Sequence, residues 1–155
     1  MSAEKDLFKP ELVFFDMEAD STDELFEKLG QKLDKMGYIN DGWLEGISTR
    51  ERKYPTGLAF PAAKIAIPHT DPEYIKIPYI VVIKPAKPIV FNHMAGAGDP
   101  VSAELIINLG VLRDGGQVET LQTLMNVFND EDLVSDIMGQ TTPEGMVEAF
   151  MKNFR

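Results

Sequence analysis

The chain of 155 residues contains no cysteine, and this absence excludes several kinds of chemistry. Without a thiol the chain can form neither a disulfide bond nor a thiolate metal site, and it cannot carry a phosphoryl group on sulfur. Histidine is almost as scarce, because His69 and His93 are the only two. Imidazole chemistry is therefore confined to two positions.

Long apolar runs and an excess of positive charge are also missing. No apolar run approaches the length of a membrane span, and the first residues lack the basic stretch and apolar core of a signal peptide. We therefore expect a cytoplasmic protein that does not insert into the membrane. The formal net charge of -10 argues against nucleic-acid binding, which depends on cationic contacts to phosphate. The charge would suit a basic protein partner, although solubility alone explains it better.

Short apolar runs bounded by proline and glycine predict the β-strands. The length and the hydrophobic content of 44% fit one domain, which we expect to span residues 1–155. We expect strands at residues 11–15, 65–67, 79–84, 89–91 and 101–111. Pro85 and Pro88 bracket a turn between two of these runs, which predicts that 79–84 and 89–91 form a hairpin.

Apolar residues at helical spacing predict five helices. Ser21 and Glu24 form a capping box before the first helix, which Gly37 ends. Its expected buried face is Leu25, Leu29, Leu33 and Met36, and that of a second helix, from residues 40–41 to before 55, is Trp43, Leu44 and Ile47. Three more helices begin near residues 117, 130 and 143. This order of elements predicts an α/β (α+β) fold, a three-layer α/β/α sandwich with a mixed β-sheet flanked by helices.

Residues 50–71 hold most of the chain's chemistry. His69 follows the apolar run 65–67, and Pro68, which lacks a backbone donor, is expected to end the strand pairing and leave the imidazole facing outward. A Pro-Thr-Gly turn at residues 55–57 could fold Arg50 back towards His69. A neutral imidazole is a nucleophile near pH 7, and an arginine fork suits a phosphoryl group carried on it. The segment therefore predicts a phosphohistidine site.

This segment resembles the active-site signature of the fructose/mannitol-type (type 2) enzyme IIA domains of the bacterial phosphoenolpyruvate-dependent sugar phosphotransferase system (PTS). Ile-Ala-Ile-Pro-His at residues 65–69 matches the core of the signature. The Arg-Glu pair at 50–51, the Tyr-Pro-Thr-Gly at 54–57 and the longer spacer are most similar to the galactitol-specific branch. The residues alone require one ring nitrogen to be free while the other is held, most simply by a backbone carbonyl of the same loop. The resemblance implies that the reactive atom of His69 is Nε2 and that the fold is the same three-layer sandwich.

The resemblance implies roles for three further residues. Arg50 matches the arginine beside the phosphohistidine and would stabilise the phosphoryl oxygens. Gln117 stands where mannitol-type relatives carry a second histidine, and a glutamine at this position resembles the galactitol branch. Its hydrogen bond to a phosphoryl oxygen would contribute about 1 kcal/mol. Thr56 could donate its hydroxyl to the same group, whereas Glu51 and its basic neighbours have weaker claims. An ordinary role remains open for each: a solvated helix end for Arg50 and Gln117, and turn structure for Thr56.

Other kinds of site find little support in the sequence. His93 lies in a glycine-rich loop and matches no position of the family. A metal site made of His69, Asp71 and His93 would lack any typical ligand spacing, and the glycine-rich loop lacks the P-loop pattern. We therefore expect no metal and no cofactor.

The sequence thus predicts a phosphotransferase that acts as a phosphocarrier. Phospho-HPr, the small histidine-phosphorylated carrier, would donate to His69, which would pass the group to a cysteine of the cognate enzyme IIB. The membrane component enzyme IIC would then transport galactitol or a related sugar alcohol or sugar. One alternative is a regulatory IIA-like phosphoprotein that controls another protein through His phosphorylation, and a metal-dependent small-molecule enzyme is a distant third.

Overall fold

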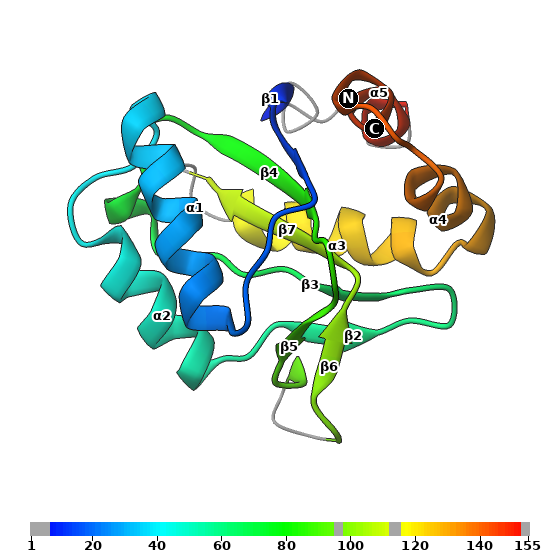
Figure 1. Ribbon diagram of the computed structural model, residues 1–155, viewed down its shortest axis with the longest axis horizontal. Coiled ribbons are helices and arrows are strands. Elements are labelled where there is room, and N and C mark those ends of the chain that lie inside the picture. The colour runs from blue at the N-terminus through cyan, green and yellow to red at the C-terminus, as the bar shows by residue number, and fades with distance from the viewer. Residues whose placement is uncertain (1–6, 95–97, 112–115, 153–155) are drawn as a thin grey trace.

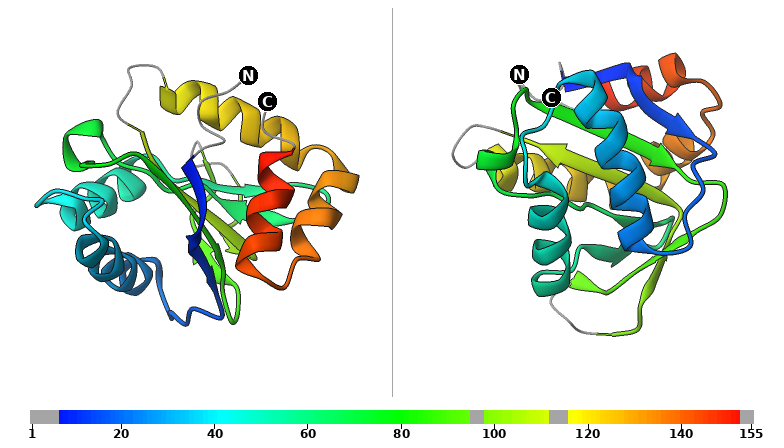
Figure 2. Two further views of the ribbon diagram at one scale, coloured as in Figure 1. Left: turned by 90° about the horizontal axis from the view of Figure 1, so that it is seen from above. Right: turned by 60° about the vertical axis from the view of Figure 1, so that its left-hand side comes forward.

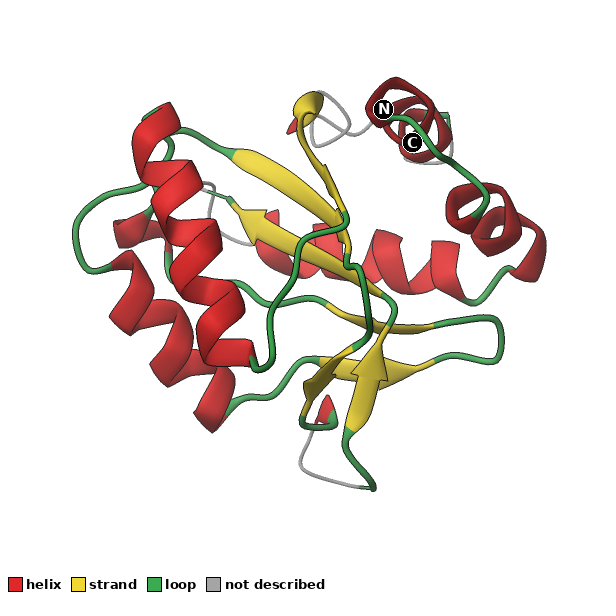
Figure 3. Cartoon of the chain, viewed as in Figure 1, coloured by secondary structure: helices red, strands yellow, loops and turns green. Residues whose placement is uncertain are grey.

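The computed structural model describes residues 7–94, 98–111 and 116–152, and of residues 116–118 it describes only the backbone. A five-stranded mixed sheet in the order β1-β4-β7-β3-β2 lies at its centre, and a two-stranded ribbon of β5 and β6 lies beside it (Figures 1 and 3). The strands are β1 (Phe8–Phe15), β2 (Gly57–Ala59), β3 (Lys64–Ala66), β4 (Tyr79–Lys84), β5 (Ile89–Phe91), β6 (Val101–Ala103) and β7 (Leu105–Gly110). The α-helices are α1 (Thr22–Met36), α2 (Trp43–Lys53), α3 (Gly116–Phe128), α4 (Glu131–Met138) and α5 (Pro143–Met151), and a short 3-10 turn, η2, covers Pro72–Tyr74.

Helices cover both faces of the sheet, which confirms the predicted three-layer α/β/α sandwich. Figure 2 shows α1 and α2 on one face and α3, α4 and α5 on the other. Alternate residues of β4 feed two separate cores: Ile80 and Val82 pack under α3 to α5, whereas Val81 and Ile83 pack under α1 and α2. A strand buried on both faces needs apolar side chains at every position, which explains why this run is continuously hydrophobic.

Strand β1 begins three positions earlier than the sequence predicts, at Phe8, so that Pro10 lies inside it. The strand lies at the edge of the sheet and pairs in parallel with β4 alone. Its register shifts between Phe8 and Val13, where the ladder is irregular. An edge strand tolerates proline because the missing N–H is not needed by a second neighbour.

The predicted hairpin between residues 79–84 and 89–91 is wrong, although both strands have the predicted bounds. Both edges of β4 are occupied, one by β1 and the other by β7, so that β5 pairs instead with β6 in the separate ribbon. The expected strand at 101–111 is divided into β6 and β7 at Glu104. There the backbone N–H of Glu104 donates to the Lys64 carbonyl at 2.7 Å, which ties this corner to the start of β3.

The ends of α1 follow the predicted capping chemistry, whereas α2 begins at Trp43, after Gly42, and not at residues 40–41. Ser21 Oγ accepts from the Glu24 N–H at 3.1 Å, and Gly37 ends α1 with a φ of 85°, a conformation that glycine adopts without strain. The predicted buried faces are wrong at two positions, because Met36 and Leu44 are each 42% exposed. Met36 is the last residue of α1, and Leu44 lies beside the Trp43 and Ile47 stripe rather than on it.

In the part of the chain that the structure describes, every helix is too short or too polar to span a membrane.

Candidate functional site

His69 lies just beyond β3, where the chain stays attached to β7. The Pro68 carbonyl accepts hydrogen bonds from the Leu109 N–H at 3.2 Å and from Asn108 Nδ2 at 2.9 Å. His69 itself forms a parallel bridge with Leu109. The prediction that Pro68 ends the pairing is therefore wrong, because proline loses its donor but keeps its acceptor. The loop that carries the imidazole is thus anchored to the centre of the sheet.

One ring nitrogen of His69 is fixed by the backbone of its own loop. Nδ1 lies 2.9 Å from the Ile67 carbonyl oxygen, which can only accept, so Nδ1 carries the proton and Nε2 has a free lone pair. Burial lowers the pKa of His69 below its ordinary value of 6.5, and the Arg50 charge lowers it further. The Ile67 carbonyl and the Asp71 charge oppose this change without reversing it. Near pH 7 the ring is therefore neutral and nucleophilic at Nε2.

His69 is far less exposed than the sequence suggested. The residue is 7% exposed, so the expectation of an outward-facing imidazole is wrong. The cause is the continued attachment to β7, which keeps the loop against the sheet instead of releasing it at Pro68. A group that reacts with the imidazole therefore has only a small exposed area to approach, on a loop that is hydrogen-bonded to the sheet.

Arg50 lies in the last turn of α2 and reaches the segment that follows His69. One guanidinium nitrogen, Nη1, lies 3.1 Å from Asp71 Oδ1, and the guanidinium carbon lies 5.6 Å from the centre of the Tyr54 ring. These residues and Tyr74 line a cavity of about 440 Å³ beside α2. The structure assigns no turn to residues 55–57, because Gly57 already begins β2, but Arg50 lies close enough to His69 for its charge to lower the pKa of the imidazole.

Glu51, for which a weaker role was predicted, is buried beside this site at 8% exposure. Its two carboxylate oxygens accept from Thr56: Oε2 from the backbone N–H and Oε1 from the hydroxyl, each at 2.8 Å. In this structure the Thr56 hydroxyl is engaged by Glu51. Trp43, Ile47 and Glu51 follow one another at four-residue spacing, so the helical stripe itself indicated that Glu51 points inward.

The remaining candidate residues lie elsewhere or outside the described part. Gln117 belongs to the first turn of α3, but its side chain lies outside the described residues, and its role stays a prediction. His93 bridges Gly57 through its backbone, and its Nδ1 lies 2.8 Å from the Met94 carbonyl oxygen. Among the described residues, no group of three or more His, Asp or Glu side chains is placed to hold a metal ion.

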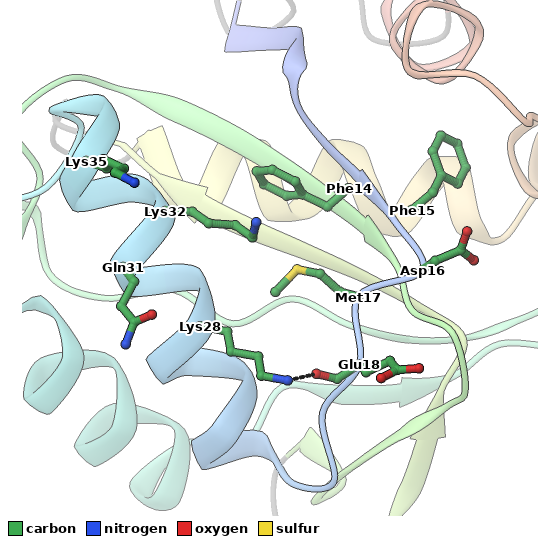
Figure 4. Close-up of a pocket in the computed structure, with 9 residues that line it drawn as sticks. All are labelled: Phe14, Phe15, Asp16, Met17, Glu18, Lys28, Gln31, Lys32 and Lys35. Atoms are coloured by element: carbon green, nitrogen blue, oxygen red, sulfur yellow. Dashed lines mark hydrogen bonds between the residues drawn. The ribbon is translucent and has the colours of Figure 1, made fainter.

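A second cavity, of about 600 Å³, lies between the end of β1 and α1 (Figure 4). Three lysines of α1 line it, Lys28, Lys32 and Lys35, opposite Phe14. Lys28 donates to the Glu18 carbonyl and pairs with Glu24, and Lys32 lies over the Phe14 ring. None of the predicted site residues lines this cavity, so it is distinct from the His69 site.

Comparison with protein families gives one match over nearly the whole chain. The model described as "Phosphoenolpyruvate-dependent sugar phosphotransferase system, EIIA 2" matches residues 6–153. The galactitol-specific EIIA component of the PTS system of Escherichia coli (strain K12) is 25% identical to this chain over 131 residues, which cover 84% of this chain and 85% of that protein.

Solved structures of other proteins have a similar fold. The nitrogen regulatory protein IIA-Ntr from Neisseria meningitidis is 24% identical, covers 96% of this chain and 99% of its own, and has a TM-score of 0.76. The complex of enzyme IIA-Mtl with phosphorylated enzyme IIB-Mtl from Escherichia coli gives 21% identity, coverage of 92% and 95%, and a TM-score of 0.73. At these identities the likeness shows the fold.

Proposed function

Because the chain belongs to the EIIA 2 family of the phosphoenolpyruvate-dependent sugar phosphotransferase system, we propose that it is a phosphocarrier that holds the phosphoryl group on Nε2 of His69. Phospho-HPr donates the group: its N–P bond breaks as a new N–P bond forms at His69. The group then passes to a cysteine thiolate of a cognate enzyme IIB, with loss of the bond to His69 and formation of an S–P bond. This relay operates in the cytoplasm, next to the membrane component enzyme IIC.

The single observation that carries the proposal is the state of the His69 ring. Its Nδ1 lies 2.9 Å from the Ile67 carbonyl oxygen, and burial lowers its pKa, so that an unprotonated Nε2 is available at neutral pH. A ring held in this tautomer can attack phosphorus without first losing a proton.

Arg50 supplies the positive charge that the transferred group needs. Its guanidinium lies beside Asp71, two positions beyond His69, and its planar fork suits the oxygens of a phosphoryl group. We assign Thr56 and Gln117 smaller parts. Thr56 links the start of β2 to Glu51 at the end of α2, and Gln117, at the start of α3, is the candidate for a neutral hydrogen bond to a phosphoryl oxygen.

Galactitol, or a related sugar alcohol or sugar, is the transport substrate that we propose. The galactitol-specific EIIA component of Escherichia coli supports this choice, and so does the glutamine at position 117. The complex of IIA-Mtl with phosphorylated IIB-Mtl supports an enzyme IIB as the acceptor. A regulatory role remains the alternative, because the nitrogen regulatory protein IIA-Ntr from Neisseria meningitidis has the same fold.

Mass spectrometry tests the phosphorylation site directly. Wild-type protein, His69→Ala and His93→Ala are incubated with phosphoenolpyruvate, enzyme I and HPr, and intact masses are measured at neutral to alkaline pH to preserve the N–P bond. We expect one phosphoryl adduct on the wild type and on His93→Ala, and none on His69→Ala. No adduct on the wild type, or equal labelling of His69→Ala, would refute the proposal.

Transfer to an enzyme IIB separates transport from regulation. The phosphorylated protein is mixed with the galactitol-type enzyme IIB, and the acceptor is assayed for a phosphocysteine. Transfer supports the transport role. A protein that accepts the group from phospho-HPr but transfers it to none of a panel of enzyme IIB proteins would favour the regulatory role.

A further inference from the structure

Four hydrogen bonds connect the end of α2 to the His69 ring in three successive links. Glu51 accepts from the Thr56 N–H and hydroxyl, each at 2.8 Å. The Thr56 carbonyl accepts from the Ile67 N–H at 3.3 Å, and the Ile67 carbonyl lies 2.9 Å from His69 Nδ1. The link from Thr56 to Ile67 extends the β2–β3 ladder by one pair, because Gly57 already pairs with Ala66. The Glu51 carboxylate is thus connected to the His69 imidazole by hydrogen bonds that pass through the Thr56–Ile67 backbone pair.

Burial of Glu51 costs free energy, because a carboxylate loses its hydration. It is 8% exposed, and it makes no ion pair with any described residue. Both of its described hydrogen bonds come from Thr56. Burial of a carboxylate without a cation opposes folding, so a contribution to stability does not explain why a glutamate is buried here.

We propose that Glu51 is a positioning residue for phosphoryl transfer: through Thr56 and Ile67 it holds His69 in the tautomer with a free Nε2 and fixes the end of α2 relative to the ring. The inference rests on the proposed function, because it assigns the group that prepares His69 for reaction. Arg50 is the residue preceding Glu51, so the same anchor sets where the guanidinium meets Asp71. Misplacement of a reacting group by about 1 Å can reduce a rate roughly a hundredfold.

Three substitutions separate a positioning role from a purely structural link between α2 and β2. Glu51→Ala removes both acceptors. Glu51→Gln keeps an oxygen for the Thr56 N–H and presents an amide to the Thr56 hydroxyl, and so is the conservative rescue. Thr56→Val removes the hydroxyl but keeps the side-chain shape and the backbone donor. Glu148→Ala is the matched control, because Glu148 is an exposed glutamate near the end of α5, in the opposite helical layer.

Kinetics and NMR provide readouts that a structural role alone would not move. For Glu51→Ala we expect kcat for phosphoryl uptake from phospho-HPr to fall roughly ten- to a hundredfold, with KM changed less than about twofold. We expect ¹⁵N spectra of the His69 ring to change from one tautomer to a mixture. Glu51→Gln should stay within about fivefold of wild type, Thr56→Val should be intermediate, and Glu148→Ala should match wild type.

The outcomes distinguish this inference from the proposed function. If folded Glu51→Ala keeps the wild-type kcat and ring tautomer, the positioning role is refuted. If Glu51→Ala does not fold, Glu51→Gln and Thr56→Val test the positioning role instead. An unchanged ring tautomer and an unchanged rate in Thr56→Val would refute the role of Glu51 through Thr56. If wild-type protein accepts no phosphoryl group, the proposed function fails, while the ring tautomer in the same variants still tests what Glu51 does to His69.

Discussion

Replacing Glu51 by glutamine should change how the stability of the protein depends on pH. Burial raises the pKa of the Glu51 carboxyl from 4.5 to about 7, and the hydrogen bonds from Thr56 lower it by less. Because the unfolded chain releases this proton at lower pH, the wild type loses stability as the pH rises from 4.5 through 7. At about 1.36 kcal/mol per pH unit, the loss reaches about 3 kcal/mol well above pH 7. Glutamine does not titrate, so the variant escapes this loss.

Urea unfolding of both proteins between about pH 5 and pH 8 measures the effect. We expect the free energy of unfolding of Glu51→Gln, minus that of the wild type, to increase by about 2.5 kcal/mol over this range. His69 acts in the opposite direction, since its lowered pKa removes stability as the pH falls below 6.5, but it is present in both proteins and cancels. Glu148→Gln, at an exposed glutamate, should give a constant difference. A constant difference for Glu51→Gln as well would refute the reasoning from burial.

Three further changes test other parts of the structure. Arg50→Lys keeps the charge but loses the planar fork, and we expect phosphoryl transfer to slow on the order of tenfold or more in rapid-quench assays. A wild-type rate would show that Arg50 acts as a point charge. Lys53→Arg is the control. Gly110→Ala would place its Cβ 2.2 Å from Cε2 of Tyr79, so the free energy of unfolding in urea should fall by about 3 kcal/mol. Gly37→Ala, which meets open space but keeps a φ of 85°, should lose about 1 to 2 kcal/mol, and equal losses at the two glycines would contradict the predicted clash. Thr142→Ala removes the bond from the Gly145 N–H to Thr142 Oγ1, 3.0 Å long, and should cost about 1 kcal/mol in thermal unfolding, whereas Thr142→Ser should restore it.

Local chemistry predicted where most elements begin and end, but it did not predict which strands pair. Pro78 and Pro85 bracket β4, and Pro88 directly precedes β5, and both runs have the expected bounds. The error lay in joining them, because β4 already has a neighbour on each edge, and one of these, β1, comes from the start of the chain. Long-range pairing of this kind depends on how the whole sheet is assembled, and a run of apolar residues does not indicate which strand will be its partner.

The candidate site shows the same division between what is local and what is tertiary. The Ile-Ala-Ile-Pro-His sequence indicated His69, and the capture of one ring nitrogen by a backbone carbonyl of the same loop was expected. The burial of His69 was not, because it depends on the bridge to Leu109, which is 40 positions away. Glu51 was underrated for a related reason: helical spacing shows that it points inward, but not that Thr56 satisfies it.

The charges around His69 explain how one site could both accept and release a phosphoryl group. In the free protein Asp71 balances Arg50, and their opposed effects on the imidazole leave burial as the main influence on its pKa. A phosphoryl group on Nε2 would add nearly two negative charges, which would compete with Asp71 for the Arg50 guanidinium. Asp71 is more than half exposed, so water can solvate its carboxylate after that exchange. Arg50 would then exchange one anion for another in each step of the relay, which keeps the bound group from being held too tightly to leave.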